Sequence, residues 1–298
     1  MLLIVLSLLA FASAEELVVL SAPSVFPAPS EGAPVLAAPL HYHEQVGVPE
    51  AARIRDEESR VMGRVAGGLG SYLGEHKFFA GLVISLTDGQ TSVCGGSLIS
   101  SNRVLTAATC WFDGQYQASA MLAVLGSVRL FSGGTRVSAA SIAVHPRFNY
   151  YYFENNLAVL NIPYVSSTSY IQPIVMANAN LSYASYTAEI IGFGKTSPGS
   201  AITESQTLRD VFVQVLTNDV CRIYYGNLVE PEHMCTSGVG ARGACGGDAG
   251  GPLILYSSAG NDVLIGVVNF WSSNGCASGY PSGHTRVAHH YNWIRAQL

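Results

Sequence analysis

Histidine is the side chain in this sequence that is best suited to proton transfer or metal binding near neutral pH. His41 and His43 flank one tyrosine and could hold a metal ion weakly, but no set of further ligands accompanies them. Gly68, Gly70 and Gly74 do not match the spacing of a nucleotide-binding loop and are more typical of turns. We therefore expect neither a metal site nor a bound cofactor.

The other six histidines do not form a pattern that indicates a catalytic base. His145 stands before Pro146 in a loop, and we interpret it as structural. His289 and His290 begin a predicted terminal helix and are expected to be solvated. His76, His233 and His284 are the remaining three, and they are scattered along the chain.

Short apolar segments separated by glycine, asparagine and serine predict the elements that position these side chains. They span residues 81–86, 104–108, 137–144, 157–160, 188–191, 211–215, 253–256 and 263–270. Regularly spaced short strands of this kind favour a β-sandwich or a β-barrel. One longer helix is predicted at the end of the chain, where Val287, Tyr291, Ile294 and Leu298 recur at helical spacing.

The composition is that of a folded protein. Of the 298 residues, 49% are hydrophobic and 12% are charged, whereas disordered chains are rich in charge and poor in hydrophobic residues. The net charge of −5 argues against a nucleic-acid partner, because binding to phosphates requires clustered basic residues. Beyond the first residues, no apolar stretch has the length that spans a membrane, so we expect no membrane partner.

Two segments precede the strand-rich region. Residues 1–14, MLLIVLSLLAFASA, are apolar, end in small residues and are typical of a signal peptide, which predicts a secreted, extracellular protein with oxidised cysteines. Residues 15–64 contain six prolines, no cysteine and a net charge of −4. We interpret residues 15–64 as a detachable, loosely folded pro-segment with a short helix near residues 49–60. A flexible tail that is never processed is the alternative.

Five motifs occur in a fixed order within residues 65–298. They are SLIS at 97–100, VLTAATC at 104–110, NLAVL at 156–160, CGGDAGGP at 245–252 and GVVNF at 266–270. In this order and spacing the chain resembles the zymogens of chymotrypsin-like (S1 family) serine proteases of the secreted arthropod type. The resemblance implies an all-β fold of two six-stranded antiparallel β-barrels with a cleft between them and a C-terminal helix.

Two kinds of covalent modification that are typical of secreted domains are expected in residues 65–298. Six cysteines permit fifteen pairings, and the resemblance selects one of them. It implies the disulfide bonds Cys94–Cys110, Cys221–Cys235 and Cys245–Cys276. Asn180 begins the sequence Asn-Leu-Ser on an expected surface loop and is a candidate glycosylation site.

The residues on which the chemistry of this family depends are replaced. Acyl transfer there needs a serine nucleophile, a histidine base and an aspartate that orients the histidine. At the matching positions this chain has Ala249, Thr109 and Asn156. An alanine methyl group cannot attack a carbonyl carbon, and a threonine hydroxyl does not accept a proton at neutral pH. The resemblance therefore implies a pseudoprotease without catalytic residues.

Other parts of the protease apparatus are retained. Arg64-Val65 resembles the activation cleavage site, and the resemblance implies that the new amino terminus of Val65 pairs with Asp248. It also implies an oxyanion hole formed by the backbone N–H groups of Gly247 and Ala249, which do not depend on the side chain. An exposed arginine and an aspartate that only caps a turn are the simpler alternative.

The specificity pocket that the resemblance implies is altered. Gly243 lies where an acid would select basic substrates, Trp271 stands where a small residue forms the wall, and His284 lies near the base. The indole would fill or close this pocket, unless the loop shifts and the ring points outward. Residues 150–153, YYYF, form either a binding surface at the rim of the cleft or contacts within their own loop.

These features predict a secreted, non-catalytic serine protease homologue that binds a protein partner. The partner would be a protease, a zymogen or another extracellular target in a proteolytic cascade. One alternative is an active serine endopeptidase, as most members of such a family are. A second alternative is a relic of a digestive protease that has kept no binding role.

Overall fold

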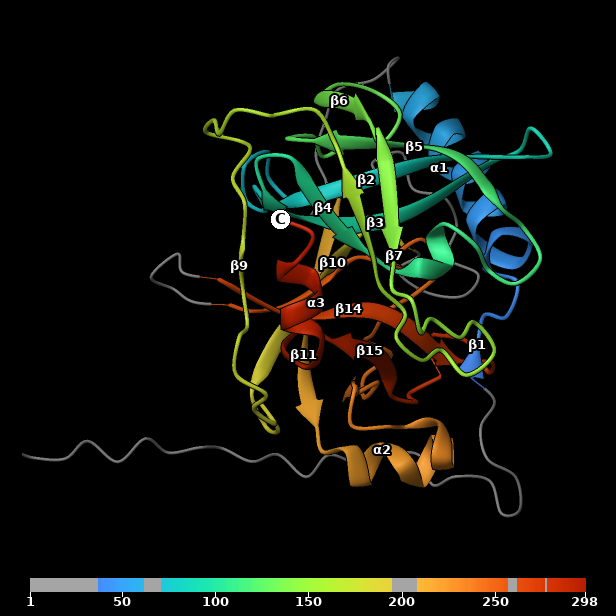
Figure 1. Cartoon of the computed structure of the whole chain (residues 1–298). Coiled ribbons are helices and arrows are strands. Elements are labelled where there is room, and N and C mark those ends of the chain that lie inside the picture. The colour runs from blue at the N-terminus through green and yellow to red at the C-terminus, as the bar shows by residue number, and fades with distance from the viewer. Residues whose placement is uncertain (1–36, 62–70, 195–207, 257–261, 277) are drawn as a thin grey trace, which may run out of the picture.

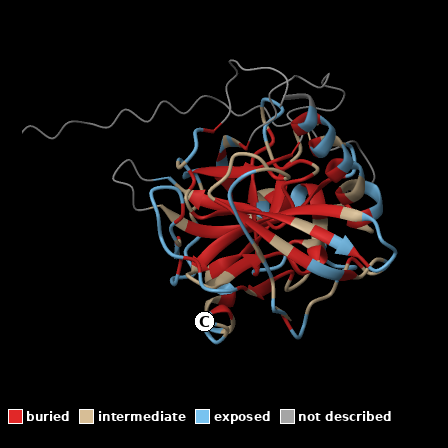
Figure 2. Ribbon diagram, turned by 90° about the horizontal axis from the view of Figure 1, so that it is seen from above, coloured by how far each residue is buried: buried red, intermediate tan, exposed pale blue. Residues whose placement is uncertain are grey.

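The computed structural model describes residues 37–61, 71–194, 208–256, 262–276 and 278–298. The expected signal peptide, residues 1–14, and the expected cleavage site at Arg64 and Val65 lie outside these residues. Most of the described elements are short strands, and they form two sheets that lie one above the other in Figure 1. Buried residues make up most of the strands in both sheets (Figure 2).

The first sheet contains seven strands. In chain order they are β2 (Phe79–Leu86), β3 (Thr91–Ser100), β4 (Arg103–Thr106), β5 (Ala118–Leu125), β6 (Thr135–Ser138), β7 (Ser141–Val144) and β8 (Ala158–Asn161). Their spatial order is β6-β5-β2-β3-β4-β8-β7, and all neighbouring strands are antiparallel. Because successive side chains point to opposite faces of a strand, Leu82 and Ile84 of β2 both lie in the core.

The second sheet closes on itself. Its strands are β1 (Ala37–Ala38), β9 (Val175–Met176), β10 (Thr187–Gly192), β11 (Arg209–Leu216), β12 (His233–Thr236), β13 (Pro252–Leu255), β14 (Val263–Ser272) and β15 (Ser282–Arg286). Strand β14 pairs with both β13 and β15, which completes a six-stranded ring in the order β14-β13-β10-β11-β12-β15. The short strands β1 and β9 add to β14 outside this ring.

The expected all-β architecture of two antiparallel units is confirmed, with one difference in detail. The second unit has the six strands that were expected. Among the described residues, the first unit is an open row of seven strands rather than a closed ring of six. Its end strands β6 and β7 have only four residues each and do not pair with one another.

Helices are few, and the longest is not the terminal one. The helices are α1 (Val48–Val61), α2 (Asn218–Tyr225) and α3 (Tyr291–Arg295), with shorter helical turns at His43–Gly47, Ala108–Cys110, Gly226–Leu228 and Val287–His290. The expected terminal helix has only five α-helical residues. Val287–His290, directly after β15, form a 3₁₀ turn, so the α-helix begins only at Tyr291.

The described part of the pro-segment is not loosely folded, and that expectation was wrong for residues 37–61. Ile54 is fully buried, and Ala51 and Glu57 are almost fully buried. Glu58 accepts hydrogen bonds from the backbone N–H groups of Leu130 and Phe131. Most of the prolines lie before Leu40, so they do not interrupt α1, and Pro49 occupies its first turn, where proline is tolerated.

Three disulfide bonds join the pairs that the resemblance implies. Their Cα atoms are 6.2 Å apart in Cys94–Cys110, 6.2 Å in Cys221–Cys235 and 5.1 Å in Cys245–Cys276, which is the usual range for disulfides. The first bond joins β3 to the turn after β4, and the others lie in the second unit. None of the described helices is long and apolar enough to cross a membrane.

Candidate functional site

Thr109 and Asn156 meet at one edge of the first sheet. Thr109 follows β4, Asn156 precedes β8, and these two strands pair antiparallel with Thr106 opposite Ala158. The register therefore brings the chain after Thr106 and the chain before Ala158 to the same end. The Asn156 Oδ1 atom accepts a hydrogen bond of 2.9 Å from the Thr109 backbone N–H, and Asn156 Nδ2 donates to Thr109 Oγ1 at 3.3 Å.

Asn269 of β14 extends this network into the second unit. Asn156 Nδ2 also donates to Asn269 Oδ1 at 2.6 Å, and Asn269 Nδ2 donates to Thr285 Oγ1 at 3.1 Å. All these side chains are buried and uncharged. The arrangement fixes the orientation of both amides, but it offers amide and hydroxyl groups where a base would be needed to activate a nucleophile.

Ala249 lies in the turn that connects the two units. Its side chain is 1% exposed, and its backbone oxygen accepts a hydrogen bond of 2.8 Å from Gly95 of β3. The following residue, Gly250, has φ of +77°, and a Cβ atom there would lie 2.2 Å from Thr106 Oγ1. The turn is therefore held closely against the first sheet, with a methyl group where the resemblance implies a nucleophile.

Asp248 is buried beside Ala249 and is held by backbone donors. Its carboxylate accepts hydrogen bonds from the N–H groups of Gly194 at 2.8 Å and Cys245 at 2.9 Å. Burial nevertheless raises the pKa of Asp248 to about 6, although both hydrogen bonds oppose this shift. A carboxylate in this environment favours a nearby cation, because neutralising its charge removes much of the cost of burial.

A cavity of about 460 Å³ adjoins this carboxylate. Gly192 and Gly194 line it together with Asp248, and Gly243 and Asp210 lie on its other sides. Gly243 has φ of +150°, and a Cβ atom there would lie 2.7 Å from Ser282 Oγ. Gly243 thus lines a cavity, as expected, but that cavity is shared with the Asp248 carboxylate.

Trp271 and His284 do not line this cavity, and their place in a specificity pocket stays a prediction. Trp271 is 6% exposed, so it does not point into solvent, and its backbone pairs with Ala38 of the pro-segment. His284 is fully buried, and its Nε2 atom lies 2.9 Å from Thr236 Oγ1. Because side chains alternate along β15, His284 faces away from the side on which Thr285 meets Asn269. Burial lowers the pKa of His284 to about 3, so the ring is neutral.

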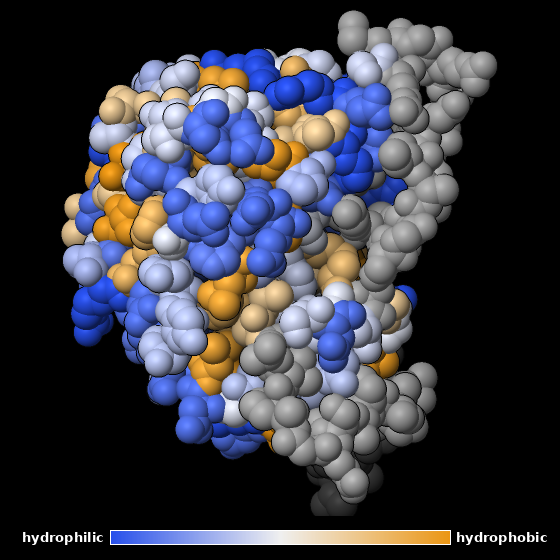
Figure 3. All heavy atoms as spheres, turned by 90° about the vertical axis from the view of Figure 1, so that its right-hand side faces the viewer, coloured by the Kyte–Doolittle hydropathy of each residue, from blue (hydrophilic) through white to orange (hydrophobic). Residues whose placement is uncertain are grey.

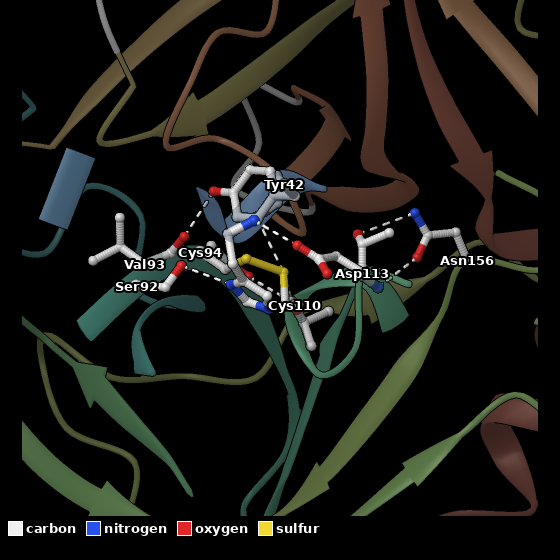
Figure 4. The surroundings of a disulfide bond; sticks show 12 residues. Tyr42, Ser92, Val93, Cys94, Cys110, Asp113 and Asn156 are labelled. Carbon is white, nitrogen blue, oxygen red and sulfur yellow. Dashed lines mark hydrogen bonds between the residues drawn. A yellow bond between two sulfur atoms is a disulfide. The ribbon is translucent and has the colours of Figure 1, made fainter. Parts of the chain in front are cut away.

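The expected oxyanion hole has a neighbour that the sequence did not indicate. Tyr42 of the expected pro-segment is 1% exposed and lies beside the backbone of Gly247, which opposes the rise in the phenol pKa. Burial and the charges of Glu50 and Asp248 outweigh this effect and hold the pKa of Tyr42 well above its ordinary value. Figure 4 shows Tyr42 near the Cys94–Cys110 disulfide, with Asn156 farther along the same edge.

The histidines of the pro-segment do not form a metal site. The His43 ring is buried, with Nδ1 2.8 Å from Ser92 Oγ. Elsewhere, Glu75, His76 and Asp210 bring one ligand atom each within 4.8 Å of one another. Two of these three residues are exposed, so we assign no metal ion to the group.

Asn269 and Tyr42 are the site residues that sequence reasoning missed. Asn269 stands inside the GVVNF motif, so its position was visible, but its link to Asn156 depends on a contact between distant segments. Tyr42 lies in a segment of weak hydrophobic periodicity, and no local pattern indicates what it would contact.

Comparison with known proteins gives the family. A family model described as Trypsin matches residues 66–294 of the chain. The chain belongs to the trypsin family of chymotrypsin-like serine proteases. This family relationship confirms the resemblance noted from the five sequence motifs.

Several relatives in this family carry the names of proteases. The Collagenase of Hypoderma lineatum is 34% identical over 238 residues, which are 78% of this chain and 86% of the relative. Serine protease SP24D of Anopheles gambiae is 35% identical over 218 residues, or 72% and 75% of the two chains. Brachyurin of Leptuca pugilator is 34% identical over 208 residues, or 68% and 87%.

A solved structure has the same fold as this chain. The structure of HL collagenase matches with a TM-score of 0.70 and 33% sequence identity. The match covers 78% of this chain and 98% of that protein. The pro-segment therefore lies largely in the part of this chain that has no counterpart there.

Proposed function

We propose that this trypsin-family chain is a secreted, non-catalytic homologue that acts by binding another protein. The observation that supports this most is the set of residues at the three catalytic positions, Thr109, Asn156 and Ala249. Ala249 supplies no oxygen to attack a substrate carbonyl, and Thr109 supplies no base. Loss of such a set as a unit costs about 10⁶ in turnover, so the remaining rate is of no use to a protease.

The competing function is an active serine endopeptidase. It is favoured by relatives named collagenase, brachyurin and serine protease. The uncharged network around Asn156 weighs against it, because every member is a hydroxyl or an amide. A relic of a digestive protease without a binding role is the third reading, and only a partner separates it from the first.

The domain boundaries belong to this proposal. A signal peptide at residues 1–14 directs secretion, residues 15–64 form the pro-segment, and residues 65–298 form the protease-homologue domain. Three disulfide bonds are consistent with an oxidising, extracellular location. Asn180 is exposed and so is accessible to glycosylation.

Cleavage after Arg64 is the activation step in this proposal. The new amino terminus of Val65 enters the cavity beside Asp248, where its positive charge pairs with the carboxylate. The burial of Asp248 supports this step, since a buried carboxylate is stabilised by a cation. The switch between precursor and cleaved form thus operates without catalysis.

The tyrosines at residues 150–152 provide a candidate surface for the partner. Tyr151 and Tyr152 are each more than half exposed and contact one another edge to face, with ring centroids 5.1 Å apart. Phe153 is buried against Phe270, with centroids 5.5 Å apart, and anchors the loop. Exposed tyrosines on an anchored loop can bury a large area on binding at low entropic cost.

Peptide hydrolysis tests the catalytic part of this proposal. The purified chain, cleaved after Arg64 and freed of the cleaving protease, is incubated with a broad peptide library. We expect no hydrolysis at enzyme concentrations at which an active trypsin digests the library completely. Hydrolysis that persists after repeated removal of contaminating proteases would support the endopeptidase function instead.

Partner capture tests the binding part. The cleaved chain is used as bait in extracellular fluid of its source, beside the double variant Tyr151→Ser/Tyr152→Ser. Tyr164→Ser is the matched control, because Tyr164 is 74% exposed at another part of the first unit. We expect one protein that is retained by the natural chain and by the control but lost from the double variant. Equal retention by all three would remove this loop from the binding surface.

A further inference from the structure

The pro-segment adds a strand to the edge of the second sheet. Ala37 and Ala38 form β1, which pairs antiparallel with Ser272 and Trp271 at the end of β14. Asn269, which belongs to the buried network at the catalytic positions, lies on this same strand. Adding a strand in this way is a general mode by which sheets bind extended peptides. Figure 1 shows β1 beside the lower sheet, below the start of α1.

A few residues later the same segment contacts the first sheet. The Tyr42 hydroxyl donates a hydrogen bond of 2.7 Å to the Val93 backbone oxygen of β3, and the side chain is buried. The same segment lies against the turn of the second unit, since a Cβ atom on Gly246 would lie 3.0 Å from Val46 Cγ1. The segment thus contacts both units, next to the turn to which the resemblance assigned the oxyanion hole.

The turn after Tyr42 is fixed on the first sheet by polar contacts. The His43 backbone N–H donates to Asp113 Oδ2 at 2.7 Å, and its ring contacts Ser92 Oγ. A Cβ atom on Gly47 would lie 1.9 Å from Ser92 Oγ, so the chain approaches β3 here as closely as glycine allows. These contacts are drawn in Figure 4 beside the Cys94–Cys110 disulfide.

Helix α1 then continues across the first unit. Arg53 donates to the Phe193 backbone oxygen at 3.1 Å and to Glu57 at 2.8 Å. Glu58 accepts from the Ser132 hydroxyl at 2.8 Å in addition to two backbone donors. Figure 3 shows the side of the molecule on which α1 lies, and hydrophilic and hydrophobic side chains intermix there. The polar contacts lie on the inner side of the helix and are sheltered from water.

All of these contacts are non-covalent. Residues 15–64 contain no cysteine, and all six cysteines pair within residues 94–276. After any cleavage at Arg64, the described part of the segment, residues 37–61, is therefore held by the non-covalent contacts of β1, Tyr42, the turn and α1. Their burial resembles that of a domain core rather than that of a tail resting on a surface.

We propose that residues 37–61 remain bound after cleavage at Arg64 and act as an internal ligand between the two units, in the cleft that we define by β3, the end of β14 and the turn at residues 245–249. The segment is an extended strand of small residues followed by a buried tyrosine. A partner protein that enters the cleft must displace it and must present an extended, uncharged loop of similar chemistry. This inference rests on the proposed cleavage, but it does not depend on whether the chain is catalytic.

The retention test uses the full chain with a recognition site for a sequence-specific protease introduced at Arg64. After complete cleavage, the protein is passed through gel filtration in native buffer, and intact masses are measured in each fraction. We expect the fragment that contains residues 37–61 to elute together with the larger chain. Elution of that fragment alone, at its own small size, would overturn the proposal.

A conservative variant tests the role of Tyr42 without disturbing the fold. Tyr42→Phe removes only the hydroxyl that bonds to Val93, and loss of one buried hydrogen bond corresponds to about a tenfold change in an equilibrium constant. We expect the cleaved fragment to dissociate about tenfold faster, as measured by its exchange with an isotope-labelled copy. The matched control Tyr164→Phe is exposed and should leave the rate unchanged. Equal rates for Tyr42→Phe and the natural chain would show that the cleft contact does not hold the segment.

Hydrogen exchange locates the retained segment. In the cleaved complex, the one backbone N–H group at Trp271 or Ser272 that faces β1 should exchange as slowly as in the precursor, because β1 still covers this edge of the strand. Tenfold or greater acceleration there, while the fragment remains bound through α1, would show that the cleft has opened. Such a result would contradict an internal ligand of the cleft even though the fragment is retained.

Discussion

At the scale of single residues, Asn156 holds its neighbours Thr109 and Asn269 in place through hydrogen bonds of its side-chain amide. Its oxygen accepts from the Thr109 backbone, and its nitrogen donates to both Thr109 Oγ1 and Asn269 Oδ1. An aspartate has no donor for the Asn269 oxygen, so the present network suits an asparagine and would not suit the carboxylate of an active relative. Thr109 and Asn156, at two of the positions that the resemblance matches to catalytic ones, are thus joined by a polar network that fits their side chains.

Asn156→Asp is therefore expected to destabilise the protein. A carboxylate oxygen would face Asn269 Oδ1, now 2.6 Å from the Asn156 nitrogen, and leave a buried acceptor unpaired. The cost should be about 1–3 kcal/mol in the free energy of unfolding at pH 7, measured by urea denaturation. Asn178→Asp, on an exposed residue, is the control. A variant as stable as the natural chain would mean that the network rearranges freely.

His284 predicts a pH dependence of stability. Its pKa is lowered to about 3 by burial, so the folded protein keeps the ring neutral, whereas the unfolded chain takes up a proton near pH 6.5. The contribution of His284 to stability is complete above pH 6.5 and is lost as the pH falls towards 3. Between pH 6 and 4, His284→Gln should reduce the slope of unfolding free energy against pH by about 1.4 kcal/mol per unit. An unchanged slope would mean that the ring is protonated in the folded state.

Residue identities at the catalytic positions could be read from the sequence, but their partners could not. The motifs around Thr109, Asn156 and Ala249 are contiguous, so a local comparison is enough to locate them. Asn269 and Tyr42 reach the site from segments that are distant along the chain, and only the fold brings them there. His284 is buried beside Thr236, and its place near the base of the specificity pocket stays a prediction.

At the scale of elements, strands were easier to predict than the helices that cover them. The apolar runs located from the sequence correspond to β2, β4, β8, β10, β11, β13 and β14, and the run at 137–144 divides into β6 and β7. Strands β3, β5, β9, β12 and β15 were not predicted. Helix α1 was expected only as a short helix in a loose segment. Its inner side uses acidic side chains that bind backbone N–H groups, so a pattern of apolar residues alone underestimates how firmly it is attached.

Glu58→Gln tests this attachment of α1. The glutamine keeps one acceptor oxygen but loses the charge that strengthens hydrogen bonds from Leu130, Phe131 and Ser132. The precursor should lose about 1–3 kcal/mol in unfolding free energy, measured by urea denaturation. Glu44→Gln, an exposed residue in the turn before α1, should change stability by less than about 0.5 kcal/mol. Equal effects of the two variants would mean that α1 contributes little to the folded precursor.

At the scale of the whole molecule, the turn that contains Asp248 and Ala249 couples the two units. Gly95 of the first sheet bonds to Ala249, and Gly194 at the end of β10 bonds to Asp248. The pro-segment crosses the same region through Tyr42. The charge on the Asp248 carboxylate therefore depends on the packing of both units and of the pro-segment.

The variant Asp248→Asn is expected to change the stability of the precursor and of the cleaved protein by different amounts. In the precursor, burial raises the pKa of Asp248 to about 6, so its contribution to stability is complete below pH 3.8 and is lost as the pH rises through 6. At pH 8 the amide should therefore cost the precursor less than about 1 kcal/mol. In the cleaved form, it would leave the amino terminus of Val65 buried without its partner, at a cost of about 3–5 kcal/mol. Equal losses in both forms, measured by urea denaturation, would argue against an inserted Val65.

The fold of the whole molecule could be predicted from the order of five motifs. Which segment occupies the cleft between the two units could not. The motifs identify the family and hence the two sheets and the three disulfide bonds. The proposed occupation of the cleft depends on residues 37–61, which have no such motif and reach distant parts of the chain through β1 and Tyr42.

Labelling by a serine-directed phosphonate tests the central claim of a non-catalytic homologue most directly. The cleaved chain is unfolded partly in urea to release the pro-segment, refolded without it, and incubated with the phosphonate beside an active trypsin. Intact mass should show no added phosphonyl group on the homologue, because Ala249 has no oxygen to phosphonylate, while the trypsin is labelled completely. Stoichiometric labelling of a single serine in the homologue would contradict the account, because it would reveal a nucleophile outside the three replaced positions.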